Sequence, residues 1–199
     1  MSREAKLIEE CKDFKKEAQK KLYDMYAPAM RGICRRYVAN FDEAEDILQE
    51  GFLKVFSKIR QYKAEGPFCS WVKRIFVNTA ISQYRKKSHQ FNFVNIEPAT
   101  ISISDIDPNL EEEEIIYADL SIEEITASIN LLPESLSIVV NLYLIEDYSH
   151  RDISEALGIS IENSKIRLLR GKHQLQKLLL EVASSKKKHH IFRNVINWS

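Results

Sequence analysis

Apolar side chains recur at three- and four-residue steps in this chain, and that spacing constrains its fold more than any other feature. Between Asp42 and Arg60 the apolar stripe consists of Leu48, Phe52, Val55, Phe56 and Ile59. A helix with this spacing buries one continuous face. Only five glycines occur among 199 residues, and few turn residues favour helices over a β-rich fold. The sequence therefore predicts an all-α protein.

Local start and stop signals place the helices along the chain. Asp42 and Glu45 have the three-residue separation of a capping box, as do Ser121 and Glu124. Gly66-Pro67 should break the chain before residues 68–87. These signals predict one helical block on each side of a segment that shows no helical stripe.

The charges are sorted along the chain, although the formal net charge is zero. Residues 1–87 carry a net charge of +7, residues 88–130 carry −10 with no Lys or Arg, and residues 131–199 carry +3. Two basic blocks around an acidic one indicate two binding domains and a linker, although an acidic loop can also serve solubility alone. We therefore expect a domain at 1–87, an acidic flexible linker at 88–118, a domain at 119–183 and a basic tail at 184–199.

The segment FCSWVKRIFVNTAISQYRKK, residues 68–87, combines four aromatic and five basic residues with no acidic one. Wound as a helix, it should bury Phe68, Val72, Ile75, Phe76 and Thr79. Arg74, Asn78 and Arg85 then share the opposite face, with Trp71 at its flank. Phe76 is expected to pack in the core, whereas Tyr84 could either pack in the core or contact nucleic acid. The exposed face suits single-stranded nucleic acid, which is held by aromatic stacking and backbone cations.

A short helix, a glycine turn and a longer helix follow within residues 149–182. Ser149 and Asp152 should open the first helix, Gly158 supplies the turn, and Ser160 should cap the second helix. The same spacing also occurs in plain helical hairpins. A cationic face on the second helix favours a helix-turn-helix that binds the DNA major groove; that face and its flanks comprise Lys165, Ile166, Arg167, Leu169, Arg170, Lys172 and His173. Gly171, inside this helix, is expected to be a close-packing site.

Taken together, the two blocks resemble a known family. FDEAEDILQEGFLKVFSKI and FCSWVKRIFVNTAISQYRKK are similar to the second conserved region of bacterial RNA polymerase sigma factors. LPESLSIVVNLYLIEDYSHRDISEALGISIENSKIRLLRGKHQL is similar to their fourth region. With these two regions and a short linker, the chain resembles the extracytoplasmic-function (ECF) group over about residues 15–87 and 121–182.

The resemblance implies a promoter-specificity subunit and assigns roles to particular residues. The polymerase core, through the β′ clamp, would contact Glu45, Asp46, Gln49 and Glu50. The minus-ten element, as double- and single-stranded promoter DNA, would contact Trp71, Lys73, Arg74, Asn78, Arg85, Lys86 and Lys87. The minus-thirty-five element would contact Lys165, Ile166, Arg167, Leu169 and Arg170. The resemblance also implies contact with the β flap and with an anti-sigma factor, and no direct membrane insertion.

Two positions depart from the family pattern. Ser82 stands where relatives commonly carry Asp, and Gly171 follows Arg170 where the recognition helix usually continues with Ala.

Other functions are less compatible with the residues. The five histidines show no metal-ligand spacing, and no Walker loop or GxSxG motif occurs, so we expect no catalytic residue, no metal and no cofactor. His150 is expected to be structural. Three separated cysteines indicate reduced thiols and a cytoplasmic location. The alternative function is a helix-turn-helix regulator that acts without polymerase core.

Overall fold

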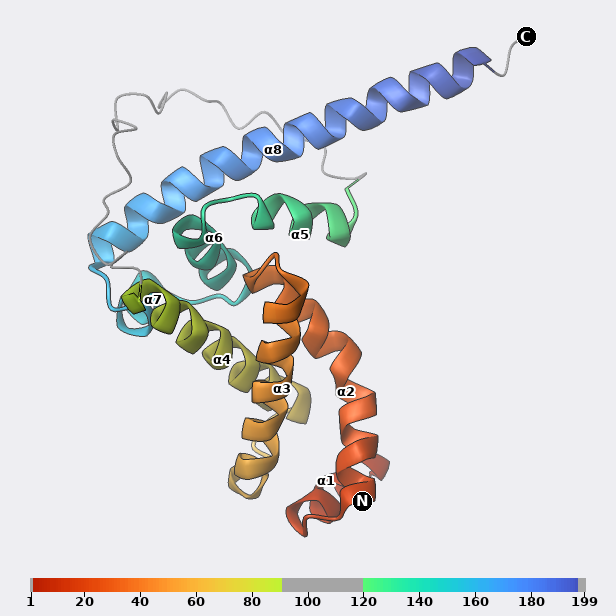
Figure 1. Ribbon diagram of the computed structural model, residues 1–199, viewed down its shortest axis with the longest axis vertical. Coiled ribbons are helices and arrows are strands. Elements are labelled where there is room, and N and C mark those ends of the chain that lie inside the picture. The colour runs from red at the N-terminus through yellow and green to blue at the C-terminus, as the bar shows by residue number, and fades with distance from the viewer. Residues whose placement is uncertain (1, 91–119, 197–199) are drawn as a thin grey trace. The chain divides into compact units, whose positions relative to one another are not determined.

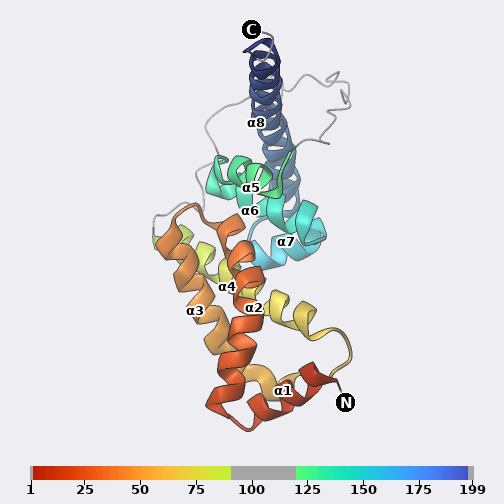
Figure 2. The same cartoon turned by 90° about the vertical axis from the view of Figure 1, so that its right-hand side faces the viewer.

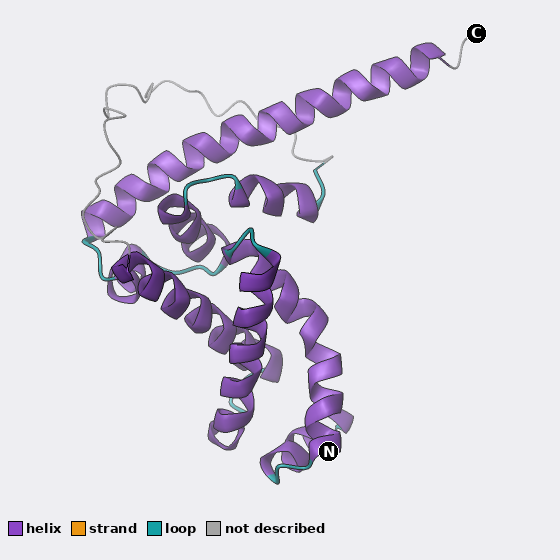
Figure 3. Ribbon diagram, in the orientation of Figure 1, coloured by secondary structure: helices purple, strands orange, loops and turns teal. Residues whose placement is uncertain are grey.

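The computed structural model describes residues 2–90 and 120–196, with side chains described at 2–88 and 120–186. Within those ranges every regular element is a helix (Figure 3). The chain divides into two compact units, Met1–Arg85 and Lys86–Ser199. The all-α class expected from the apolar spacing is confirmed. The expected linker, 88–118, lies outside the described residues apart from its first three positions.

The first unit is a bundle in which α2 and α3 run side by side and α1 packs on α2 (Figures 1 and 2). Its elements are α1 (Arg3–Lys12), α2 (Lys16–Tyr37), α3 (Phe41–Lys58), the 3₁₀ turn η1 (Ile59–Gln61) and α4 (Phe68–Gln90). The expected stripe of α3 is largely confirmed, since Leu48, Phe52, Val55 and Ile59 are buried and Phe56 is half-buried. The helix α4 begins directly after Gly66-Pro67, as expected, and continues to Gln90.

The start of α3 corrects one expectation from the sequence. Asn40, and not Asp42, is the capping residue: its Oδ1 accepts hydrogen bonds from the backbone N–H groups of Asp42 at 2.8 Å and Glu43 at 3.1 Å. Glu45 does not close a capping box, because Arg31 of α2 donates to its carboxylate at 2.6 Å and 3.3 Å. The Glu45 carboxylate therefore pairs with Arg31 on another helix and not with the backbone at the start of α3.

A glycine sets the distance between α3 and α4. A Cβ atom on Gly51 would lie 2.4 Å from Cε1 of Phe76, whose ring is fully buried. The ring packs edge-on against Phe52 with centroids 5.2 Å apart. The expectation that Phe76 packs inside is thus confirmed, and no other residue type fits at Gly51 without displacing the ring.

The second unit is built on a long helix that packs along α6 and also contacts α5 and α7 (Figure 1). Its elements are α5 (Ile122–Asn130), α6 (Glu134–Val140), the π-helical turn η5 (Asn141–Ile145), α7 (His150–Leu157) and α8 (Ile161–Ile196). Ser121 and Glu124 form the expected capping box at α5. The expected tail, 184–199, continues α8 as far as Ile196. In the described part of the chain, no helix has the length and apolar character that crossing a membrane requires.

Gly171 lies where α8 crosses α6. A Cβ atom there would lie 2.5 Å from Cγ2 of Val140 and 3.6 Å from the Leu136 side chain. Both neighbours are buried. The expected close-packing role of Gly171 is confirmed, and the departure from the family pattern at this position has a packing cause.

Candidate nucleic-acid interface

The loop before α4 holds the start of the candidate nucleic-acid helix. The Tyr62 hydroxyl donates a 2.6 Å hydrogen bond to the Gly66 carbonyl. The backbone N–H of Trp71 donates to the Pro67 carbonyl at 3.3 Å. Phe68, the first helical residue, is only 2% exposed and packs edge-on against Tyr26 and Tyr62. The helix therefore begins at a fixed point on the first unit.

Trp71 lies at the edge of this aromatic cluster. Its ring centroid is 5.5 Å from that of Phe68, in a stacked arrangement, and 5.6 Å from that of Tyr62. Trp71 remains half-buried, whereas Phe68 is enclosed. An indole that packs on the core and stays partly accessible can stack on an unpaired base without reorganising the core.

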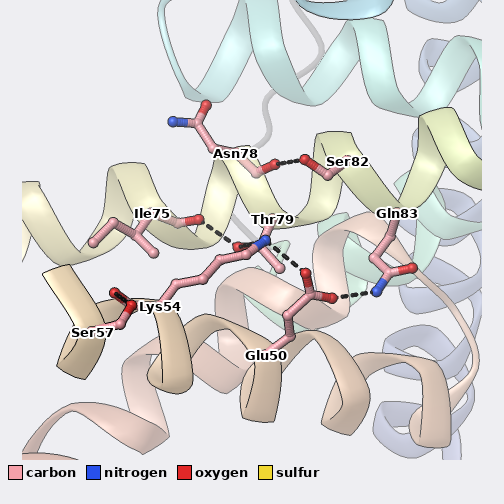
Figure 4. Close-up of polar contacts among 8 residues, drawn as sticks. All are labelled: Glu50, Lys54, Ser57, Ile75, Asn78, Thr79, Ser82 and Gln83. Atoms are coloured by element: carbon pink, nitrogen blue, oxygen red, sulfur yellow. Dashed lines mark hydrogen bonds and ion pairs between the residues drawn. The ribbon is translucent and has the colours of Figure 1, made fainter.

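The outer face of α4 carries the polar residues that the sequence placed there. Arg74 and Asn78 are exposed, and the Asn78 amide points away from α3 (Figure 4). Arg85 and Lys86 are exposed, while Lys73 and Lys87 are half-buried. The helix contains no acidic residue, so its outer face is suited to a polyanion.

A polar network holds the inner face of α4 against α3 (Figure 4). Lys54 of α3 forms an ion pair with Glu50 at 2.7 Å and donates to the Thr79 hydroxyl at 3.3 Å. Gln83 donates to the second carboxylate oxygen of Glu50 at 2.5 Å. Thr79 is fully buried and also donates to the Ile75 carbonyl. Ser82 donates to the Asn78 carbonyl at 2.8 Å on the other side of the helix.

The four residues expected at the polymerase core fall into two groups. Asp46 and Gln49 are exposed, whereas Glu45 and Glu50 are half-buried. Glu50 takes part in the network above, and the hydrogen bond from Arg31 lowers the pKa of the Glu45 carboxyl. The charges of Glu45 and Glu50 are therefore already paired within the chain, with Arg31 and Lys54 respectively.

Sequence reasoning missed Leu53, which is 71% exposed on α3. It follows Gln49 by four residues and Asp46 by seven, so all three share one side of the helix. The same spacing rule, applied to the exposed side, identifies it from the sequence. An exposed leucine between polar neighbours gives this side of α3 an apolar centre.

The helix-turn-helix is fixed by contacts within its turn. Gly158 adopts the left-handed conformation, with φ of 68°, and its N–H donates to the Ser154 carbonyl. The Ser154 hydroxyl donates to the Ile159 carbonyl at 2.6 Å. Nδ1 of His150 lies 3.0 Å from the hydroxyl of Ser164, which is fully buried. This bond joins the start of α7 to α8, so the expected structural role of His150 is confirmed.

The outer side of α8 presents part of the expected set of DNA-binding residues. Lys165, Ile166 and Leu169 are exposed, and Arg170 is half-buried. Arg167 lies elsewhere: its side chain is 7% exposed, and it follows Ser164 by three residues on the inner side of the helix. Its contact with DNA stays a prediction, while its position favours packing.

Each of the two helical units exposes a helix face with basic side chains, which is typical of nucleic-acid-binding proteins. Comparison with known proteins narrows this class. The model of Sigma-70 region 2 matches residues 22–90, and that of Sigma-70 region 4 matches residues 122–175. The ECF RNA polymerase sigma factor SigW of Bacillus subtilis is 29% identical over 182 residues, which cover 89% of this chain and 97% of the relative.

A second relative agrees with this assignment. An ECF RNA polymerase sigma-E factor of Haemophilus influenzae is 26% identical, with 85% of this chain and 92% of the relative covered. The structure of the sigma factor RpoE bound to the anti-sigma factor NepR, from Bartonella quintana, aligns with a TM-score of 0.46 at 24% identity over 80% of this chain and 95% of that one. The chain belongs to the bacterial RNA polymerase sigma factors, in the ECF group. It is a promoter-specificity subunit and a transcription initiation factor.

Proposed function

We propose that three surfaces divide the work of initiation. The exposed side of α3 binds polymerase core, the outer face of α4 opens and holds the minus-ten element, and the outer side of α8 reads the minus-thirty-five element. The observation that carries this proposal is α4, which presents the half-buried Trp71 beside the exposed Arg74 and Asn78 and has no acidic residue. Run-off transcription with core polymerase on a genomic promoter library tests it. Absence of promoter-specific transcripts above core alone would refute it.

In this scheme, Trp71 and Asn78 act on separated strands. Stacking on an aromatic ring contributes about 1–3 kcal/mol per base, and the Asn78 amide supplies both a donor and an acceptor for a base edge. Lys73, Arg74 and the basic end of α4, which comprises Arg85, Lys86 and Lys87, bind the DNA backbone. We expect Trp71→Ala to slow open-complex formation more than Trp71→Phe, and a template with a pre-opened minus-ten bubble to restore most of the rate. Equal defects on closed and pre-opened templates would place Trp71 outside strand opening.

Core binding by α3 is proposed to use Asp46 and Gln49 around Leu53. Charge on Asp46 attracts a basic partner, and removal of the exposed leucine from water adds affinity. The half-buried Glu45 and Glu50 would support the surface through Arg31 and the network with Lys54. Leu53→Ala should weaken binding to core in a direct titration. Met25→Ala, which truncates another exposed side chain of the same unit, is the matched control and should bind normally.

The remaining parts of the proposal follow from family membership. We expect the catalysis of initiation to reside in core polymerase, so this chain is not an enzyme, and we place its action in the cytoplasm with that polymerase. The β flap and an anti-sigma factor are further expected partners. Co-purification from cells that express a tagged chain, with and without an inducing stress, tests both contacts. A regulator that binds its operator without core is not favoured.

A further inference from the structure

The outer side of α8 carries two aliphatic side chains between two edges of cationic side chains. Ile166 is 37% exposed and Leu169 is 49% exposed, and they lie one turn apart at the centre of that side. Lys165 and Lys172, both exposed, run along one edge, and the half-buried Arg170 lies on the other. Glu162, at the first turn, is the acidic residue of this surface. Two aliphatic side chains are thus bordered by cations on both sides.

These aliphatic residues are not needed by the core of their own unit. The buried stripe of α8 consists of Ser164, Leu168, Gly171, Leu175 and Leu179. Ile166 is about 200° around the helix from Ser164, so it points away from that stripe. The pair therefore remains available to a partner that has anionic rims and a floor with apolar groups.

The major groove of DNA has this arrangement. Its two rims are phosphate backbones, and the methyl group of thymine is the apolar group that a base edge presents there. Single exposed leucines are common on proteins, but the cations at both edges match two phosphate rims. A flat apolar partner would not explain these flanking charges.

We infer that Ile166 and Leu169 recognise thymine methyl groups in the minus-thirty-five element. The inference rests on the proposed function of α8 and adds the base chemistry that it reads. Lys165 and Lys172 set the position of the helix by binding phosphates, and the two aliphatic side chains discriminate thymine from cytosine. Specificity at these positions then comes from apolar contact, without a hydrogen bond to the base.

The test removes single methyl groups from DNA and leaves the protein intact. Promoters recovered by run-off transcription are synthesised with deoxyuridine in place of each thymine of the upstream element, one at a time on either strand. Holoenzyme binding should fall about three- to four-fold at one or two of these thymines, as expected for loss of one buried methyl. Deoxyuridine outside the element should have no effect.

Protein variants then assign each methyl to a side chain. Ile166→Ala and Leu169→Ala should each bind the unmodified promoter less tightly and lose the response to deoxyuridine at one position. Lys172→Ala should weaken all templates alike, keep that response and reduce the dependence of binding on salt. Ile122→Ala, which truncates an exposed side chain outside this surface, should behave as the wild type.

Several results would overturn the inference. One is an upstream element without thymine, and another is indifference of the wild-type holoenzyme to every deoxyuridine. A third is unchanged methyl sensitivity in both aliphatic variants, which would assign the pair to a protein partner. In each case promoter-specific transcription persists, so the failure is distinct from failure of the proposed function, in which no such transcript forms on unmodified DNA.

Discussion

Replacing Gly51 by alanine should destabilise the first unit, although alanine is the better helix former. The gain in helix propensity is about 0.5–1 kcal/mol. Against it stands a Cβ atom only 2.4 Å from Cε1 and 2.7 Å from Cδ1 and Cζ of Phe76. The ring has no exposed surface and is held against Phe52, so it cannot swing aside. Overpacking of this kind costs about 1–3 kcal/mol, and we expect a net loss of about 1–2 kcal/mol.

Urea unfolding followed by tryptophan fluorescence measures this loss. The chain has two tryptophans, Trp71 and Trp198, so a Trp198→Phe background leaves Trp71 as a reporter of the first unit. A net loss of this size should lower the urea midpoint by roughly 0.5–1 M, given the usual dependence of stability on denaturant. An unchanged slope would show that only stability has changed.

Two further variants make the reasoning refutable. Gly32→Ala, in α2, is the matched control, because a Cβ atom there meets nothing within 4 Å, and it should stabilise by about 0.5–1 kcal/mol. Phe76→Leu removes part of the ring, so the double variant with Gly51→Ala should be more stable than the sum of the single effects by about 1 kcal/mol. If Gly51→Ala raised the midpoint as Gly32→Ala does, or if no coupling appeared, the close approach would not constrain the helices.

Three other outcomes are expected. Ser149→Ala removes the cap of α7 and should cost about 1 kcal/mol; because hydrogen bonds from Ser149 lower the pKa of Asp152, that pKa should rise in an NMR titration. Burial raises the pKa of Cys34 to about 12 and that of Cys11 to about 11, so a thiol reagent should modify the exposed Cys69 at once and the other two only on unfolding. Because Arg31 lowers the pKa of Glu45, the stability from this pair is present above the ordinary value of 4.5 and is lost as the pH falls through the lowered value. Urea midpoints of Arg31→Gln should therefore fall less steeply with acid than those of the wild type.

Much of the architecture could be predicted because its signals are local. The caps at Ser121, Ser149 and Ser160 depend on residues three positions away, and each forms as expected. The apolar stripe of α3 and the buried position of Phe76 follow from helical spacing. The close-packing role of Gly171 could be predicted because a glycine inside a helix lowers the stability of that helix unless close packing requires it.

The corrections concern contacts with residues distant in sequence. Glu45 has the spacing of a capping residue, but Arg31 on another helix binds it, and Asn40 takes the cap. On the inner side of α8, Leu179 is buried, whereas its neighbour Leu178 is half-buried. A shift of one residue turns a side chain by about 100°, so small errors in helical phase change which residues face outward.

In both units, the residues on the inner side of a helix make the contacts that hold it in place, and the residues on its outer side do not. In α4 the polar groups of Thr79 and Gln83 are engaged by Lys54 and Glu50, and the outward Asn78 has no such tie to α3 (Figure 4). In α8 the inner positions Ser164 and Gly171 are engaged by His150 and Val140, which leaves Ile166 and Leu169 outside. The inward residues thus contribute most to the stability of the fold, and the outward residues contribute little. Substitutions at the outward positions should therefore change which promoter is read at small cost in folding, whereas substitutions at the inward ones should change folding first.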